Sequence, residues 1–293
     1  MADAMLGVIG GSGLYEFPDL EEVRTRDVAT PYGQPSAPIT LGRLAGTAVA
    51  FLPRHGIGHR LSPSDVPYRA NVYAMKALGV THLVSLSAVG SLQETVAPLD
   101  LVLPDQIVDR TVARPRSFFG DGVVAHVGLA QPFCPSLRAA LREAAAPTGR
   151  MLHETGTYVC IEGPQFSTRA ESEIYRSWGV AVIGMTAMPE ARLAREAELC
   201  YAVVAMVTDY DVWHESAEQV SVELVVANLR ANVAAGRELV RRLVGAGLPP
   251  CDAGCSEALR DAIITDPAVI SPAARRRLGL IADKYLPPSP DLA

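Results

Sequence analysis

The sequence predicts an α/β fold in which helices cover a largely parallel or mixed β-sheet. From about residue 70 onward, helical patterns alternate with strands rich in β-branched and apolar residues. Polar and glycine-rich loops follow most of these strands. The chain has 293 residues, of which 49% are hydrophobic, so it is long enough to bury a sizeable core.

The expected strands are short apolar runs that end in glycine, proline or polar loops. An apolar run ending in glycines opens the series, and two strands are expected on either side of Ala45 and Gly46. With their following loops, the strands are expected within residues 5–13, 39–56, 81–91, 99–109, 157–166, 180–185 and 201–211.

The expected helices show amphipathic spacing and recognisable ends. Gly79 ends the first helix, and Pro135 stands in the first turn of the second. The helices are expected at residues 70–79, 135–146, 169–179, 188–199 and 221–244.

The C-terminal tail is set apart from the rest of the chain. Residues 1–248 form the predicted main domain, and a Gly/Pro-rich stretch after the long helix is typical of a linker. The tail, residues 249–293, is helical in pattern and carries three consecutive arginines at 275–277. We expect it to pack on the core or on a neighbouring subunit.

Composition excludes several classes of function. A formal net charge of −6 argues against a nucleic-acid-binding surface, which needs clustered Lys and Arg. No apolar run approaches the roughly 20 residues that a membrane helix needs.

The five cysteines are an odd number and are widely spread, which argues against a disulfide framework. Cys251 and Cys255 form a C-x-x-x-C pair, but no second Cys/His pair accompanies it in the tail. We therefore expect reduced thiols, no metal, and a cytoplasmic protein.

A glycine-rich loop, Gly10 to Gly13, follows the first strand. Its backbone N–H groups and the Ser12 hydroxyl could converge on an anion. It lacks the third small residue of a dinucleotide fingerprint and the Gly-Lys-Ser/Thr of a P-loop. A plain tight turn explains this loop equally well.

Arg54, His55 and His59 occupy a second glycine-containing loop. A guanidinium can hold a phosphate with two hydrogen bonds, and an imidazole can donate a third. The H-x-x-x-H spacing could also indicate a metal, but Gly56 and Gly58 disfavour the helix that the metalloprotease pattern requires. We expect an anion-binding loop.

Two further loops could line a pocket. Ser87 lies in a run of small residues at a strand end, where backbone N–H groups are accessible to a ligand. Phe166 follows Glu162 and a Gly-Pro turn, and it could stack on a flat base. Taken alone, the Ser87 segment is better explained by an ordinary strand-to-loop turn, and a turn with a core phenylalanine explains the Phe166 segment as well as a binding site does.

Asp209 and Asp211 follow a wholly apolar strand. Because they are two residues apart, they share one face of an extended backbone. Their mutual repulsion and burial should raise one pKa, and a carboxylic acid with a raised pKa can protonate a leaving group near neutrality. A D-x-D metal site and helix capping remain open on this local pattern.

At these residues the sequence resembles the trimeric purine nucleoside phosphorylase family, and within it the branch that acts on 5′-methylthioadenosine. The matching stretches run from about residue 5 to 245 and include GVIGGSGLYE, PRHGIGHRLSPSDVPYRANVYAMKALG, SAVGSL, TYVCIEGPQFSTRAES and VAMVTDYDVW. The resemblance implies a single-domain, three-layer fold with a central mixed sheet flanked by helices.

The resemblance also implies roles for individual residues. Asp209 would be the general acid toward N7 of the purine, and Val222, Val225 and His126 would surround the 5′ substituent or set specificity with Ser167. The matching phosphate positions are Ser12, Arg54, His55, Ser87, Ala88 and Thr186, and the nucleoside positions are Met185, Phe166, Asp209 and Asp211. His126 would come from a neighbouring subunit of a homotrimer.

The implied reaction is cleavage of the N-glycosidic bond of 5′-methylthioadenosine by inorganic phosphate, which is a co-substrate, with no cofactor. An Asp at position 209 favours a 6-aminopurine, since it can accept the N6 hydrogens. The alternatives are a phosphorylase acting on 5′-methylthioinosine or 6-oxopurine nucleosides, a hydrolase that uses water, and a nucleoside-binding protein without catalysis.

Overall fold

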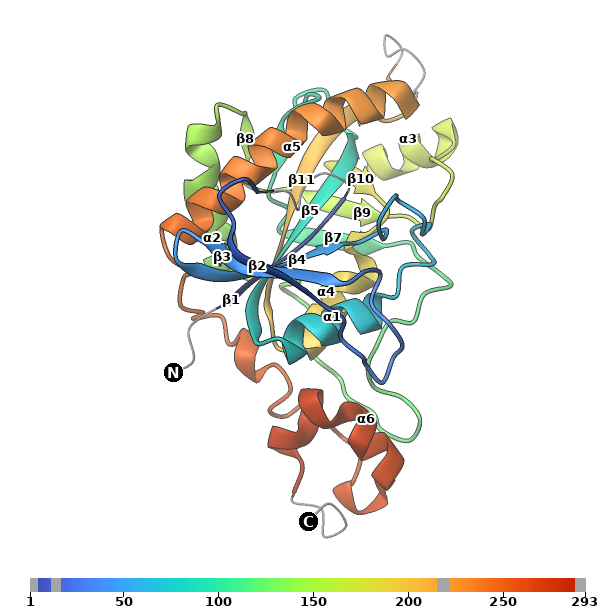
Figure 1. Cartoon of the computed structure of the whole chain (residues 1–293). Helices are drawn as coiled ribbons and strands as arrows, with labels where there is room; N and C mark the ends of the chain where they lie inside the picture. Colours follow the sequence, from blue (N-terminus) through green and yellow to red (C-terminus); the bar gives the residue numbers. More distant parts are fainter. Residues whose placement is uncertain (1–4, 12–16, 215–221, 288–293) are drawn as a thin grey trace.

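A branched β-sheet forms the middle layer of the molecule, with helices on both of its faces (Figure 1). This computed structural model describes residues 5–11, 17–214 and 222–287, without the side chains of residues 222–225 and 229. The predicted three-layer α/β fold with a mixed sheet is confirmed.

The sheet contains eleven strands in the described ranges. Its main path runs β2-β3-β4-β1-β5-β10-β9-β7, while β11 pairs with β5 and β6, and β6 pairs with β8. The strands are β1 (Met5–Gly10), β2 (Glu21–Arg26), β3 (Ile39–Leu44), β4 (Thr47–Pro53), β5 (Val80–Ser91), β6 (Leu101–Val102), β7 (Gln106–Asp109), β8 (Leu152–His153), β9 (Thr157–Cys160), β10 (Val182–Gly184) and β11 (Cys200–Tyr210).

Pro104 divides the single strand expected at residues 99–109. Proline has no N–H to give to a ladder, so the chain leaves the sheet there. The two resulting strands join different branches, since β6 pairs with β11 and β8 whereas β7 pairs with β9.

β5 is the strand at which the sheet branches. Its first half pairs with β1 as far as Ser85, and its last two residues, Gly90 and Ser91, pair with β10. β11 follows the other edge of β5 from His82 to Ser91. Among the described strands, none therefore covers residues 86–89 on the side where β1 and β10 diverge, and a cavity opens there.

The residues of β11 alternate between the two faces of the sheet, which explains why its sequence is apolar throughout. Tyr201, Val203, Ala205 and Val207 belong to the core on the side of helices α1 (Tyr68–Ala77) and α4 (Ala187–Glu196). The even-numbered residues 200–206 belong to the core on the side of α2 (Pro135–Ala145) and α5 (Val222–Gly245). A strand buried on both faces cannot show polar alternation.

The remaining main-domain helix, α3 (Arg169–Ser177), begins with a capping box. The Thr168 hydroxyl accepts a hydrogen bond from the Glu171 backbone N–H, and the Glu171 carboxylate accepts one from the Thr168 N–H. This cap fixes the first residue of α3, and with it the point at which the preceding loop, with Phe166 and Ser167, joins the helix. None of the helices described is both long and apolar enough to cross a bilayer.

Leu259, Leu278 and Ile281 of the tail belong to the same core cluster as α1 and α4, and only part of the tail is helical. Helix α6 (Pro272–Ala282) is present, and it lies on the far side of the molecule from α5 (Figure 1). Residues 258–266 are not helical: Ile263 bridges to Ala125 and Ile264 donates to the Val124 carbonyl. These backbone pairings replace helical ones, and Asp266-Pro267 begins a separate 3₁₀ turn, η3 (Pro267–Val269).

Candidate functional site

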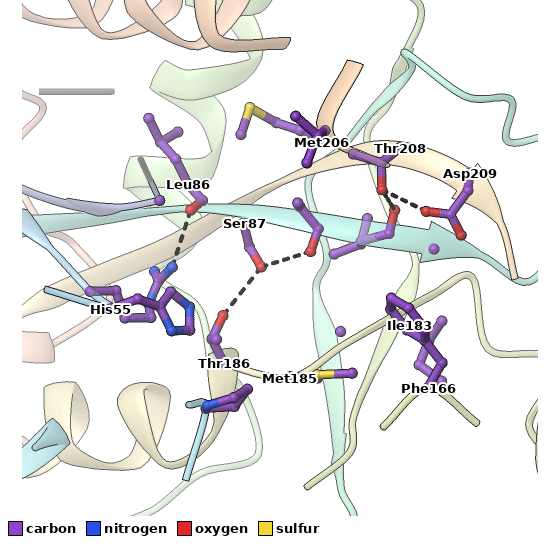
Figure 2. A pocket seen from close by; sticks show the side chains of 18 of the residues that line it. His55, Leu86, Ser87, Phe166, Ile183, Met185, Thr186, Met206, Thr208 and Asp209 are labelled. Atoms are coloured by element: carbon purple, nitrogen blue, oxygen red, sulfur yellow. Dashed lines mark hydrogen bonds between the residues drawn. The ribbon is translucent and has the colours of Figure 1, made fainter. Parts of the chain in front are cut away.

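A cavity of about 790 Å³ lies at the branch point of the sheet (Figure 2). Residues from the ends of several strands, and from α5, reach it. Those the sequence singled out are Arg54, His55, His59, Ser87, Ala88, Phe166, Ser167, Met185, Thr186, Asp209 and Asp211. The fold therefore gathers them around one cavity, although they are as much as 157 residues apart in sequence.

Hydroxyl groups gather at one end of the cavity, close to His55 (Figure 2). The Ser87 Oγ lies 3.3 Å from both the Thr186 Oγ1 and the Tyr158 hydroxyl oxygen. Gly184 makes room for this arrangement, because a Cβ there would lie 1.9 Å from the Tyr158 oxygen. Ser87 and Thr186 are both buried, so their hydroxyls are shielded from bulk water.

The Arg54 guanidinium lies at the same end, but protein groups engage most of its N–H donors. Its Nε and Nη2 donate to the Glu190 carboxylate at 3.1 and 3.3 Å, and Nη2 also donates to the Ser85 Oγ at 2.6 Å. Nη1 donates to the Leu86 carbonyl oxygen at 3.3 Å. Since Nη1 carries two hydrogens, one is left for a ligand, so the two-pronged grip expected from the sequence becomes a single contact.

His55 is held in one tautomer. Its Nδ1 lies 2.9 Å from the Leu61 carbonyl oxygen, which can only accept, so the proton is on Nδ1. Burial, with the charge of Arg54 as the next cause, lowers the His55 pKa to about 4. The imidazole is therefore neutral near pH 7, and its Nε2 carries a lone pair in place of the expected donor.

Two carboxyl groups line the opposite end of the cavity. Asp209 and Asp211 are both buried, and Thr208 Oγ1 donates to the Asp209 Oδ2 at 2.7 Å. Burial raises the pKa of Asp209 to about 6 against the effect of this hydrogen bond, and the charge of Asp211 raises it further. The strand bulges at Thr208, yet both carboxyls still line the cavity.

Apolar side chains form the wall between these ends. Figure 2 shows Phe166 beside Ile183, with Met185 lying between them and Thr186. Phe166 is 48% exposed, which leaves it accessible to a flat ligand, whereas Ser167 is buried with no hydrogen-bond partner for its Oγ among the described residues.

Two buried charged residues that support the site were not singled out from the sequence. Glu190 holds Arg54, and Arg114 fixes the two loops that carry Met185 and Phe166. Arg114 Nη1 donates to the carbonyl oxygens of Met185 and Met188, and its Nη2 donates to that of Glu162. Their partners are far away in the sequence, and α4 also carries Arg192, Arg195 and Glu196, so no local pattern singled out this role.

Four expected site residues are not placed in the cavity. His126 lies instead in a second, shallower pocket beside the tail, with Gly254 and Glu257. Ser12 falls outside the described residues, as do the side chains of Val222 and Val225. The phosphate-binding role of Ser12 and the specificity roles of His126, Val222 and Val225 stay predictions.

The cysteine arrangement corrects one step of the sequence argument. From the sequence alone zinc is not expected, because the tail offers only Cys251 and Cys255. The fold brings Cys134 and Cys200 to them, so that the four sulfur atoms all lie within 4.8 Å of one another. The second pair that the tail lacks comes from the main domain.

The chain is similar in sequence to a family of known proteins. The sequence model of the "Phosphorylase superfamily" matches residues 5–245. The chain is 53% identical to an S-methyl-5′-thioadenosine phosphorylase of Geobacter sulfurreducens, over 97% of this chain and 100% of that protein. It is 54% identical to one of Cereibacter sphaeroides, over 96% of this chain and 98% of that protein.

Solved structures show the same similarity. A methylthioadenosine phosphorylase from an Antarctic soil metagenomic library superposes with a TM-score of 0.90 and is 48% identical, covering 96% of this chain and 99% of that one. The enzyme of Schistosoma mansoni in complex with adenine has a TM-score of 0.82 at 38% identity, covering 87% of this chain and 96% of that one.

Proposed function

Because the chain belongs to the phosphorylase superfamily, we propose that it cleaves 5′-methylthioadenosine with inorganic phosphate. The products are adenine and 5-methylthioribose 1-phosphate, a step of purine and methionine salvage. The observation that carries the proposal is one cavity with two different ends, an Arg/His/hydroxyl group at one and a protonatable Asp at the other.

Phosphate is assigned to the hydroxyl end. Ser87 and Thr186 supply donors, and the remaining Nη1 hydrogen of Arg54 adds a charged donor. Ala88 lines the same cavity, and its backbone belongs to this set by resemblance. Ser12 belongs to this set by resemblance. A phosphate held beneath the sugar stabilises positive charge that develops at C1′ and is positioned to attack it.

The nucleoside is assigned to the remaining length of the cavity. Met185 lies against the ribose, Phe166 stacks on the base and sugar, and Asp209 faces the purine. A purine leaves poorly as an anion, so protonation at N7 by Asp209 lowers the barrier to departure. Asp211 stands beside it as the second purine-binding carboxyl.

Adenine is favoured over a 6-oxopurine because protonated Asp209 can give its proton to N7 through one oxygen while the other oxygen accepts a hydrogen from N6 and repels a carbonyl oxygen at that position. The methylthio group is assigned to an apolar region that Val222 and Val225 complete, with Ser167 adjusting substrate choice.

A homotrimer is part of the proposal. His126 lies outside the cavity of its own chain, so it reaches a 5′ substituent only in a neighbouring subunit. The cytoplasm is the proposed compartment, since all five cysteines are free thiols.

The deciding experiment measures base release from 5′-methylthioadenosine and 5′-methylthioinosine side by side, each with and without phosphate. We expect phosphate-dependent release of adenine and much slower release of hypoxanthine. Faster cleavage of the inosine form would reassign the substrate, release without phosphate would indicate a hydrolase, and tight binding without release would indicate a binding protein.

A further inference from the structure

Four of the five cysteines converge outside the cavity, from three separate parts of the fold. Cys134 is the N-cap of α2, Cys200 is the first residue of β11, and Cys251 and Cys255 lie in the segment after α5. Their sulfur atoms all lie within 4.8 Å of one another. None of the four lines the cavity, so the cluster is independent of the proposed reaction.

The spacing of these sulfur atoms suits a shared central ion. Zinc–thiolate bonds of about 2.3 Å place tetrahedral ligands about 3.8 Å apart. The Sγ atoms of Cys134 and Cys251 are 3.9 Å apart, close to that edge, whereas a disulfide requires about 2.05 Å. All five cysteines are free thiols in the structure.

The loop between Cys251 and Cys255 has the form of a ligand pair. Its three-residue spacing lies within the range typical of zinc sites, and Gly254 has a φ of +66°, which lets the chain turn back before Cys255. His82 Nε2 lies 2.9 Å from the Pro249 carbonyl oxygen and so donates to it, which fixes the approach of this loop. Outer contacts of this kind orient metal ligands.

The surroundings can compensate the charge of bound thiolates. Cys134, Cys200 and Cys255 are buried among apolar side chains, and Cys251 is half-buried. Arg195 Nη1 donates to the Cys255 Sγ at 3.6 Å, and the N-terminus of α2 adds a partial positive charge beside Cys134. Four thiolates around a divalent ion carry a net charge of −2, which these groups partly offset.

We propose that Cys134, Cys200, Cys251 and Cys255 form a closed structural zinc site. Binding releases four thiol protons and forms four zinc–sulfur bonds, with no change of oxidation state. With four protein ligands, the ion has no open position for a substrate, so its role is structural. It joins the start of the tail to α2 and β11, and thereby holds the segment that leads to residues 258–287 against the core.

The test starts with the full-length chain, carrying no metal-binding tag, expressed in zinc-supplemented medium and purified under reducing conditions. Elemental analysis should give about one zinc per chain. Cys251→Ser should lose most of this zinc, and Cys160→Ala is the matched control, since Cys160 is the fifth cysteine and lies outside the cluster. This control should keep the full amount.

Two further measurements on the wild-type chain test the zinc site even if a variant fails to fold. In the wild-type chain, mercurial titration of the thiols should release the zinc, and cobalt replacement should give the visible absorption of a tetrahedral thiolate complex. A metal-free chain that takes up no added zinc under reducing conditions would overturn the proposal. So would one equivalent of iron in its place, or an intact mass showing disulfides between these cysteines.

Discussion

Arg54 and Glu190 form an ion pair that is shielded from solvent at the hydroxyl end of the cavity. Their side chains are 2% and 1% exposed, and two hydrogen bonds of 3.1 and 3.3 Å join them. Tyr201 donates a further bond to the Glu190 Oε1 at 2.9 Å. Burial lowers the pKa of Arg54, but the charge of Glu190 more than restores it, so the net shift is upward.

Removal of Glu190 should therefore destabilise the fold. Glu190→Ala leaves the Arg54 charge buried without a partner, which costs about 3–5 kcal/mol of unfolding free energy. Urea denaturation measures the loss. As a control, Glu143→Ala breaks the exposed pair with Arg142 and should cost about 1 kcal/mol or less. Equal small losses in the two variants would show that the buried pair contributes no more than a surface one.

Much of the fold follows from local patterns. The apolar runs around Val8, Val84 and Val204 and the amphipathic spacing of α2 and α5 predict elements that the structure confirms. One exception is the strand expected at residues 99–109, which Pro104 divides into β6 and β7. β2 shows no apolar alternation, because all six of its residues are exposed at the sheet edge. Its pairing depends on β3, which sequence periodicity does not report.

Residues at each end of the cavity could be singled out from the sequence, but the buried side chains that hold them in place could not. Ser87 lies in β5, Asp209 lies near the end of β11 and Phe166 follows a Gly-Pro turn, and all three line one cavity. That Glu190 occupies most of the Arg54 donors depends on contacts 136 residues apart. The joining of Cys134 and Cys200 to the tail likewise depends on tertiary contacts that the local sequence does not contain.

Ser87 offers a test of the phosphate assignment that leaves Arg54 and its partner intact. Ser87→Ala removes one hydroxyl contact to a charged ligand, worth about 1.5–3 kcal/mol, so the KM for phosphate should rise by roughly 10- to 150-fold. The KM for the nucleoside should change little. Ser91→Ala, on the same strand but outside the cavity, is the control and should leave both values unchanged. An effect on the nucleoside KM alone would place phosphate elsewhere.

Asp209 offers a test of the general acid. Asp209→Asn keeps the size of the side chain but cannot give a proton to N7, so turnover of adenine nucleosides should fall by about 10²-fold or more. Steady-state base release measures the change. Asp211→Asn, which keeps the acid at 209, should reduce turnover less. Unchanged activity of the Asp209 variant would show that another group protonates the base.

The pH profile tests the same acid in the unmodified chain. Protonated Asp209 is the reactive form, and its pKa lies at about 6 because burial raises it. The kcat/KM for 5′-methylthioadenosine should therefore fall with rising pH above about 6, approaching tenfold per unit. This limb should be absent in Asp209→Asn. Its persistence in the variant would assign the pH dependence to a different residue.

His55 should couple phosphate binding to proton uptake. In the free protein its pKa is about 4, lowered first by burial and then by Arg54, so Nε2 carries no proton at neutral pH. A phosphate dianion beside the ring favours the imidazolium and raises this pKa. Part of the population should then take up a proton at Nε2 and donate it in a hydrogen bond to the phosphate.

Calorimetry in two buffers of different ionisation enthalpy measures this uptake directly. The number of protons bound per phosphate should be larger for the wild-type chain than for His55→Gln. Phosphate itself exchanges the same number of protons with both proteins, so subtracting one value from the other removes that contribution. His59→Gln is the matched control, because that ring stacks on His55 at 4.3 Å between centroids but makes no bond to Leu61. Equal uptake in all three proteins would mean that His55 stays neutral and accepts a hydrogen from the bound phosphate.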